Sequence, residues 1–183
     1  MMSNDQQPTL AKGFVQIAYI VADVEKSSLQ WATQRGAGPF FLKPFKTVGE
    51  VTYKGQPATL DHISSFGQYG SMMIELIQPL GDAPSVYRDH NGSGAEGLHH
   101  FAQMCPDLEA SIAACAAMGY PLVCRTGTDK TPAAFVDARH ELGHMIELCQ
   151  ASPSLQYLYQ FVADAARDWD GTDPVRHLVP PSK

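Results

Sequence analysis

The segments QIAYIVADVE (residues 16–25) and HFAQMCPDLE (residues 100–109) have the same organisation, and this duplication decides the fold that we expect. Each begins with a polar residue that can bind a metal and continues as an apolar run typical of a β-strand. Each reaches an aspartate, Asp23 or Asp107, seven residues later. An aspartate at that point can accept a hydrogen bond from the first turn of a helix. Both segments therefore predict a strand followed by a helix.

The residues after each aspartate have helical spacing. In the second copy, residues at positions i, i+4, i+7 and i+8 are apolar or small and share one helical face. They are Leu108, Ile112, Cys115 and Ala116. The first copy follows the same template with Val24, Trp31 and Ala32. A glycine follows each pattern, Gly36 in one and Gly119 in the other, and we expect the helices to end there.

A second pair of matching segments lies downstream. MIELIQ (residues 73–78) and MIELCQ (residues 145–150) are identical at five of six positions, and both are predicted to be buried strands. Each apolar run is interrupted by one glutamate, Glu75 or Glu147. A charged side chain inside such a strand is costly unless a partner compensates it.

Each half of the chain thus reads strand, helix and then further strands, the last of which carries a glutamate. The first half is longer, because Glu75 follows Gln16 by 59 residues while Glu147 follows His100 by 47. The extra length lies in residues 44–70, which contain several Gly and Pro residues and predict a longer loop. Residues 79–97 are expected to connect the two halves.

Two duplicated modules that close on each other would bring their inward polar residues to one point. Those residues are Gln16, Glu75, His100 and Glu147, which predict one divalent metal site. Amide, imidazole and carboxylate ligands suit Zn²⁺, Ni²⁺, Co²⁺, Mn²⁺ or Fe²⁺, and two carboxylates neutralise a dication. Taken singly, a glutamate could face water at a sheet edge and a histidine could be an ordinary core residue. The matched positions of all four favour the metal site.

The composition indicates a folded protein and excludes several classes of partner. The chain has 183 residues, of which 44% are hydrophobic and 17% charged, with a net charge of −6. We expect no nucleic-acid binding, because no basic run is present, and no membrane span, because no apolar run approaches about 20 residues. The four cysteines form no CxxC pair and are expected to be reduced. With no apolar leader at residues 1–13, we expect a cytoplasmic protein.

At these residues the sequence resembles the vicinal-oxygen-chelate superfamily, which includes glyoxalase I, methylmalonyl-CoA epimerases, extradiol dioxygenases and bleomycin-resistance proteins. The resemblance covers about residues 14–150. Its most specific stretch is Pro79-Leu80-Gly81, His90-Asn91-Gly92 and the segment GLHHFA at residues 97–102, which is similar to the linker of the epimerases. The resemblance implies an α+β fold, in which two tandem βαβββ modules form a cupped mixed sheet around one metal.

The expected modules span residues 10–80 and 95–152, and residues 153–183 add a C-terminal helix and tail to the same compact unit. Residues 155–169 have one apolar helical face, formed by Leu155, Leu158, Tyr159, Val162 and Ala166. We expect this helix to pack on the outer side of the sheet or on a neighbouring subunit. The alternative is closure of the pocket by Tyr157 or Trp169. Residues 173–183 are expected to be irregular.

The family ligand in the paired-histidine segment is the second histidine, here His100, and the internal match of Gln16 with His100 agrees. Strand alternation should then point His99 the other way. Epimerases normally have His where this chain has Gln16 and often Gln where it has Glu75. The order Gln, Glu, His, Glu resembles some glyoxalase I enzymes instead. The linker therefore favours an epimerase, and the ligands favour a glyoxalase.

The chemistry that both relatives imply is metal-assisted proton transfer beside a carbonyl or thioester, by a lyase or isomerase. Glu147 is the first candidate for the catalytic base and Glu75 the second. In epimerase-like sites a first-module carboxylate also takes part, and Asp61 is the nearest candidate. The neighbouring His62 could equally face the pocket, or both could be ordinary polar strand residues.

Two other functions are compatible with the superfamily. An extradiol-type dioxygenase needs two histidines and one carboxylate, and the first-module histidine is missing here. A non-catalytic ligand-sequestering protein commonly lacks the complete ligand set, which this chain retains. The expected substrate is a small carbonyl compound, thioester or glutathione adduct, and the resemblance also implies a homodimer.

Overall fold

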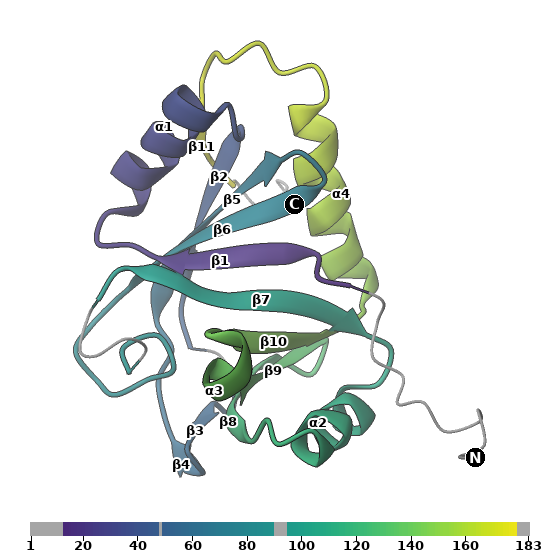
Figure 1. Ribbon diagram of the computed structural model, residues 1–183. Helices are drawn as coiled ribbons and strands as arrows, with labels where there is room; N and C mark the ends of the chain where they lie inside the picture. The colour runs from purple at the N-terminus through teal and green to yellow at the C-terminus, as the bar shows by residue number, and fades with distance from the viewer. Residues whose placement is uncertain (1–12, 48, 90–94, 179–183) are drawn as a thin grey trace.

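The computed structural model describes residues 13–47, 49–89 and 95–178, which form one eleven-stranded mixed sheet with four helices (Figure 1). The elements in chain order are β1 (Gln16–Ile20), α1 (Val24–Arg35), β2 (Phe40–Phe45), β3 (Thr52–Tyr53), β4 (Gln56–Pro57), β5 (His62–Tyr69), β6 (Met72–Pro79), β7 (Gly97–Cys105), α2 (Leu108–Ala117), β8 (Leu122–Thr128), β9 (Thr131–Asp137), α3 (Arg139–Leu142), β10 (Met145–Gln150), α4 (Pro153–Ala166) and β11 (Val175–His177). The strand order across the sheet is β11-β2-β5-β6-β1-β7-β10-β9-β8-β3-β4. The expected His90-Asn91-Gly92 motif, the first residues of the first module and residues 179–183 of the tail lie outside the described residues.

The two strand–helix units begin as the sequence predicts. The Asp23 carboxylate accepts a hydrogen bond from the Lys26 amide at 3.0 Å, and the Asp107 carboxylate accepts one from the Ala110 amide at 2.9 Å. Helix α1 ends at Gly36, whose positive φ of 68° is the left-handed conformation common at helix ends. These caps confirm that both copies use the same local device to turn from a strand into a helix.

The halves join through antiparallel pairing of β1 with β7, and the register around this pair is symmetric. Gln16 lies opposite Ala102, and Ala18 lies opposite His100. On the outer sides, Glu75 of β6 lies opposite Ala18, and Glu147 of β10 lies opposite Ala102. Each half therefore repeats the arrangement of the other about an axis between β1 and β7. Because residues two apart on a strand share a face, the four predicted ligands share one face of the sheet.

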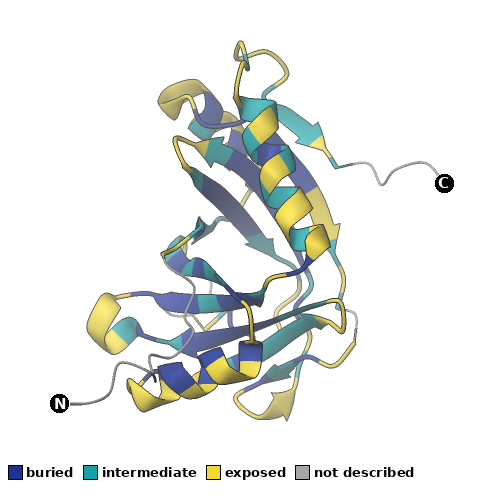
Figure 2. Ribbon diagram, turned by 90° about the vertical axis from the view of Figure 1, so that its right-hand side faces the viewer, coloured by how far each residue is buried: buried dark blue, intermediate teal, exposed yellow. Residues whose placement is uncertain are grey.

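Strand alternation separates an outer face that carries helices α1 and α2 from an inner face. On β6, Ile74 and Leu76 pack with α1 residues, whereas Met73 packs with Val162 of α4. On β10, Ile146 and Leu148 pack with α2 residues. Figure 2 shows the buried strands between the helices. The glutamates occupy the alternate positions on β6 and β10, so they point to the inner face.

The structure corrects the expected long loop at residues 44–70. This segment contains the short hairpin β3–β4 and the whole of strand β5, and β3 pairs with β8 of the second half. Lys54 and Gly55 both have positive φ, 51° and 75°, as a tight two-residue hairpin turn requires. The extra length of the first half is therefore a hairpin that reaches across to the other half of the sheet.

Helix α4 also differs from the prediction. It spans Pro153–Ala166 rather than residues 155–169, because Ser152 caps its first turn. The helix lies on the inner face of the sheet and not on the outer side. Its apolar face covers Phe41 and Phe66 of the inner face. The two residues suggested for pocket closure do not provide it, since Tyr157 is 72% exposed and Trp169 packs in the α1 cluster.

Three other features complete the fold. The expected irregular tail contains the short strand β11, which pairs in parallel with β2. All four cysteines are buried and have free thiols. Among the described helices, none combines the length and apolarity needed to cross a membrane.

Packing at the first-module sheet predicts the result of a substitution at Gly67. A Cβ atom there would lie 2.6–2.8 Å from ring carbons of the fully buried Phe40. We expect Gly67→Ala to lower the free energy of unfolding by about 1–3 kcal/mol, the usual cost of overpacking, as measured by urea denaturation. Phe40→Leu should partly relieve the clash, so the double variant should be less destabilised than the two single effects predict. Strict additivity would contradict this account.

Candidate active site

Three of the predicted ligands meet on the inner face of the sheet. The His100 Nε2 atom lies 3.3 Å from Glu147 Oε2 and 3.8 Å from Glu75 Oε2. One ligand atom from each of these residues lies within 4.8 Å of the other two. They come from β7, β10 and β6, so the symmetric register about β1 and β7 is what brings residues of both halves together.

The His100 ring is oriented by its neighbour. His99 Nε2 lies 3.0 Å from the Val86 carbonyl oxygen, which can only accept, so this nitrogen carries a proton. In a neutral His99 the Nδ1 atom is then an acceptor, and His100 Nδ1, 2.8 Å away, donates to it. In a neutral His100, Nε2 then carries a lone pair that faces the two glutamates. It is buried and makes no hydrogen bond to any described residue.

The position of His99 corrects the expectation that it points away from His100. Ala18 pairs with His100 but Tyr19 pairs with Leu98, so His99 is an extra residue in β7. Such a bulge breaks the strict alternation of side chains. The two rings lie 5.0 Å apart, and both pack against Phe135. His99 therefore supports His100 directly, as a metal-binding histidine usually requires.

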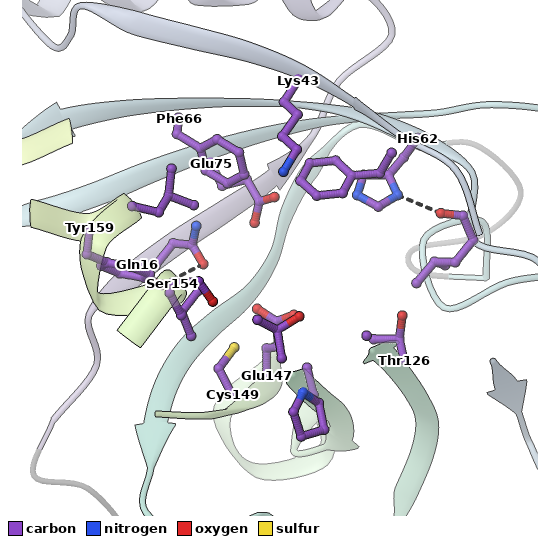
Figure 3. A pocket seen from close by; sticks show the side chains of 18 of the residues that line it. Gln16, Lys43, His62, Phe66, Glu75, Thr126, Glu147, Cys149, Ser154 and Tyr159 are labelled. Carbon is purple, nitrogen blue, oxygen red and sulfur yellow. Dashed lines mark hydrogen bonds between the residues drawn. The ribbon is translucent and has the colours of Figure 1, made fainter. Parts of the chain in front are cut away.

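Gln16 occupies the fourth predicted position. Its side chain is 3% exposed and lines the same cavity as the glutamates. The Gln16 Oε1 atom accepts a hydrogen bond from the Tyr159 hydroxyl at 3.2 Å, and Nε2 contacts the Met73 sulfur at 3.4 Å. Helix α4 thus holds the amide of Gln16 at the inner face (Figure 3).

The two glutamates differ in their surroundings. Burial, followed by the negative charge of Glu147, raises the pKa of Glu75 to about 7, and the Ser64 hydroxyl donates to Glu75 at 2.6 Å. Burial also acts to raise the pKa of Glu147, but the hydrogen bond and positive charge that a protonated His100 supplies outweigh it, and the pKa is lowered. Glu75 therefore takes up a proton more readily than Glu147, which lowers the repulsion between the two carboxylates.

A cavity of about 540 Å³ opens above these residues, and both halves of the sheet and α4 line it. Most of its wall is apolar, with contributions from Phe45, Leu60, Phe66, Pro132 and Leu158. Lys43 is the single lysine or arginine among the described residues that line it. A space of this size fits a small-molecule ligand, with its few polar groups gathered beside the glutamates.

Several residues of the cavity were not selected from the sequence. His62, named there only as an alternative, lies in the cavity wall, and so do Lys43, Tyr87, Cys149 and Tyr159. The sequence held one signal for Tyr159, its place on the apolar face of the C-terminal helix. It held none for Tyr87, which comes from the connection between the halves.

Asp61, the first-module carboxylate that the epimerase resemblance suggested, is not among the residues that line this cavity. Its carboxylate accepts hydrogen bonds from the Thr47 amide at 2.7 Å and from the Lys46 ammonium at 3.0 Å. The Thr47 amide contributes most to lowering the pKa of Asp61 to about 2, with Lys46 next. Asp61 precedes the first residue of β5, and its neighbour His62 carries the ring that enters the cavity.

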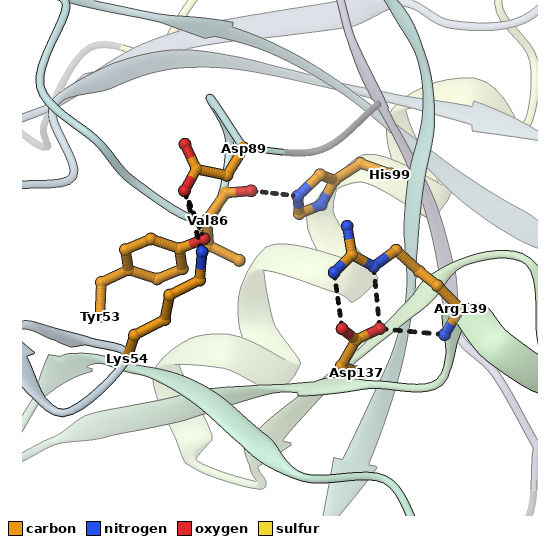
Figure 4. A network of polar contacts seen from close by, with 7 residues as sticks. All are labelled: Tyr53, Lys54, Val86, Asp89, His99, Asp137 and Arg139. Atoms are coloured by element: carbon orange, nitrogen blue, oxygen red, sulfur yellow. Dashed lines mark hydrogen bonds and ion pairs between the residues drawn. The ribbon is translucent and has the colours of Figure 1, made fainter. Parts of the chain in front are cut away.

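A polar network lies behind the paired histidines (Figure 4). The Tyr53 hydroxyl and the Lys54 ammonium both donate to the Asp89 carboxylate, at 2.9 and 3.2 Å. Asp89 ends the described part of the connecting segment that also carries the Val86 carbonyl bound by His99. The network therefore ties the β3–β4 hairpin to the segment that fixes the histidine pair.

These residues fit a divalent cation. An unprotonated, buried His100 Nε2 facing two carboxylates is an unfavourable arrangement without a positive charge between them. Imidazole and carboxylate donors at such close range suit Zn²⁺ and similar first-row ions. Gln16 adds an amide oxygen at the same cavity.

Comparisons with known proteins agree with this geometry. Residues 15–135 match the model of the Glyoxalase/Bleomycin resistance protein/Dioxygenase superfamily. The methylmalonyl-CoA epimerase of Mycobacterium tuberculosis is 20% identical with a TM-score of 0.55, over 84% of this chain and 97% of that one. A hypothetical protein from Bacillus halodurans C-125 is also 20% identical with a TM-score of 0.52, over 76% and 94% of the two chains. No curated protein matches the sequence. At this identity the solved structures show the shared fold.

The low pKa of Asp61 predicts a pH-dependent contribution to stability. A carboxyl group whose pKa is lowered by folding stabilises the native state above its ordinary pKa of about 4, and this effect is lost as the pH falls toward 2. We expect Asp61→Asn to lower the melting temperature at pH 7 but not at pH 2. Asp82→Asn, at a fully exposed side chain, should have little effect at either pH. An Asp61→Asn difference that persisted unchanged at pH 2 would contradict the assignment.

Proposed function

Because this chain belongs to the Glyoxalase/Bleomycin resistance protein/Dioxygenase superfamily, we propose that it is a divalent-metal-dependent lyase or isomerase. The proposed reaction is proton transfer at a carbon beside a carbonyl or thioester. The single observation that carries this proposal is the meeting of Glu75 and Glu147, which line a largely apolar cavity, with the fully buried His100 beneath them.

We propose Gln16, Glu75, His100 and Glu147 as the residues that hold the metal. The lone pair of His100 Nε2 and the closeness of the two carboxylates support three of them. The symmetric register that relates Gln16 to His100 supports the fourth. The donor set is compatible with Zn²⁺, Ni²⁺, Co²⁺, Mn²⁺ or Fe²⁺. An ion bound there would supply a Lewis acid for negative charge on a substrate oxygen.

Glu147 is the better candidate for the base. Its side chain is 15% exposed, compared with 9% for Glu75, and it lines the cavity. Glu75 is further restrained by the short hydrogen bond from Ser64. The apolar walls exclude water from the substrate, which strengthens the electrostatic interactions within the cavity. A carboxylate at Glu147 can therefore accept a proton from a carbon held above it.

The two other activities of the superfamily receive less support. The group formed by Glu75, His100 and Glu147 contains one histidine, whereas an extradiol dioxygenase uses two histidine ligands and one carboxylate. A ligand-sequestering protein has no need of the buried, oriented carboxylates. We keep the homodimer as a proposal from the family resemblance, to be tested by sedimentation.

The metal site predicts a stoichiometry and a stability change. Protein purified without a metal-binding tag should bind one divalent ion per chain by elemental analysis. Metal at about 100 times its dissociation constant should add roughly 2.7 kcal/mol of stability, which corresponds to about 5–10 °C in melting temperature. Both effects should be lost in the Glu75→Ala, Glu147→Ala double variant. Undiminished metal in that variant would refute the site.

A matched control separates metal loss from general damage. The Glu109→Ala, Glu141→Ala double variant removes two glutamates of the second module that lie away from the cavity. Glu109 binds Arg125, and Glu141 accepts a hydrogen bond from Tyr120. This variant should retain the metal. The site variant should still fold, because its removed carboxylates are buried and repel each other.

The chemistry predicts exchange of a substrate α-proton with solvent. The test is a panel of chiral 2-substituted acyl-CoA esters, including methylmalonyl-CoA, and glutathione hemithioacetals in D₂O, followed by mass spectrometry. Glu147→Gln should slow exchange by roughly 10²–10⁴-fold, the usual contribution of acid–base catalysis, whereas Glu109→Gln should not. Cleavage of a catechol with O₂ uptake, and no exchange from any panel member, would favour the dioxygenase instead.

A further inference from the structure

His62 lies in the cavity wall with a fixed ring orientation. Its side chain is 9% exposed, and it lines the cavity from strand β5. The ring stacks on Phe45 with a centroid separation of 4.9 Å and an interplanar angle of 9°. Tyr87 packs edge-on against it at 5.0 Å. These two contacts hold the imidazole in one plane.

The backbone selects the tautomer of this ring. His62 Nδ1 lies 2.6 Å from the Leu60 carbonyl oxygen. Because a carbonyl oxygen has only lone pairs to offer, Nδ1 carries the proton and donates it. The lone pair of a neutral His62 is therefore on Nε2, which faces the cavity (Figure 3). No described residue forms a hydrogen bond with Nε2.

The surroundings keep His62 in its basic form. Burial lowers the pKa of His62, and this outweighs the Leu60 carbonyl and the negative charges of Glu147 and Asp61, which raise it. A protonated His100 would act in the same direction as burial. The other ionisable groups of the wall near it are Lys43, Tyr87 and Glu75. A neutral imidazole at pH 7 can accept a proton from a bound molecule.

His62 and Glu147 lie on different halves of the sheet. His62 belongs to β5 and Glu147 to β10, and the strands β6, β1 and β7 separate them. Both side chains line the one cavity, so a ligand bound there has a carboxylate on one side and an imidazole on the other. Two proton-transfer groups on opposite sides of one carbon atom can remove a hydrogen from one face and supply one to the other.

We propose that His62 is a second catalytic residue, which transfers a proton on the face of the substrate opposite Glu147. This inference rests on the proposed function and makes it specific: the reaction inverts a stereocentre. The substrate class is a carbonyl or thioester compound with one hydrogen on a chiral α-carbon.

Solvent water closes the proton balance of the reaction. The Glu147 carboxylate takes the α-hydrogen of one enantiomer, and the electrons of the broken C–H bond form the C=C bond of an enolate while the carbonyl pair moves to oxygen. The enolate carbon then takes, on its other face, a proton that His62 Nε2 has received from solvent, and the carbonyl is restored. Glu147 returns its proton to solvent, so both groups regain their starting forms. For the opposite enantiomer His62 Nε2 takes the α-hydrogen, and Glu147, after protonation by solvent, supplies the proton.

The first experiment examines the tautomer and needs no substrate. Protein labelled with ¹⁵N-histidine, prepared with and without Zn²⁺, is measured by NMR at pH 7, and His62 is assigned by its absence in His62→Gln. We expect a protonated Nδ1 and an unprotonated Nε2. A protonated Nε2 would overturn the proposal, because the cavity would then face a nitrogen that cannot accept a proton.

The second experiment follows the stereochemistry. Each chiral acyl-CoA ester of the panel, beginning with methylmalonyl-CoA, is supplied as separate enantiomers in D₂O. The wild type should interconvert them. His62→Gln should slow interconversion by roughly 10²–10⁴-fold, while one enantiomer still exchanges its α-hydrogen through Glu147. His144→Gln is the matched control, because His144 is also 9% exposed and contacts a backbone carbonyl, that of Met145, outside the cavity.

The outcomes separate the proposed function from the proposed role of His62. If the wild type exchanges no α-hydrogen from any panel member, the proposed function fails and this inference fails with it. If the wild type exchanges deuterium without inversion, or if His62→Gln interconverts the enantiomers at the wild-type rate, the proposed function stands and the role of His62 is overturned.

Discussion

The antiparallel pairing of β1 with β7 is the interaction on which the rest of the structure depends. It joins the two halves into one sheet, and its register places Gln16 and His100 in equivalent positions. The parallel neighbours β6 and β10 then bring one glutamate each to the same face. A shift of either strand by one residue would turn its polar side chain toward the outer face, where α1 and α2 pack. The register of four central strands therefore determines whether a site exists.

The site that results is electrostatically demanding. Two carboxylates and an imidazole lie close together beneath an apolar cavity, where unpaired charge is costly. Hydrogen bonds from neighbouring side chains orient and stabilise these groups. The His99–His100 contact directs one lone pair toward the carboxylates, and the Ser64 hydroxyl binds Glu75. The network around Asp89 in turn holds the segment that orients His99.

The first half of the sheet has acquired features that the second half lacks. Its additional hairpin crosses to β8, and helix α4 covers its inner face. Together with His62 and Tyr87 these elements give the cavity two chemically different walls: the β10 wall carries Glu147, and the β5 wall carries a neutral imidazole. The duplicated framework explains the floor of the site, and the departures from the duplication explain its walls.

The sequence by itself determined the order of elements, the helix caps and the residues at the floor of the cavity. These follow from local rules, because an aspartate caps a helix within three residues and alternation along a strand needs only its neighbours. Only the tertiary structure decided what depends on distant segments. The bulge at His99 arises from pairing with β1. The carboxylate of Asp61 is bound by Lys46 and Thr47 and does not line the cavity. Helix α4 was amphipathic in the sequence, but an apolar face does not say which side of a sheet it will cover. Helix α4 covers Phe41 and Phe66 on the inner face, where both are buried, and this placement makes Tyr159 a partner of Gln16.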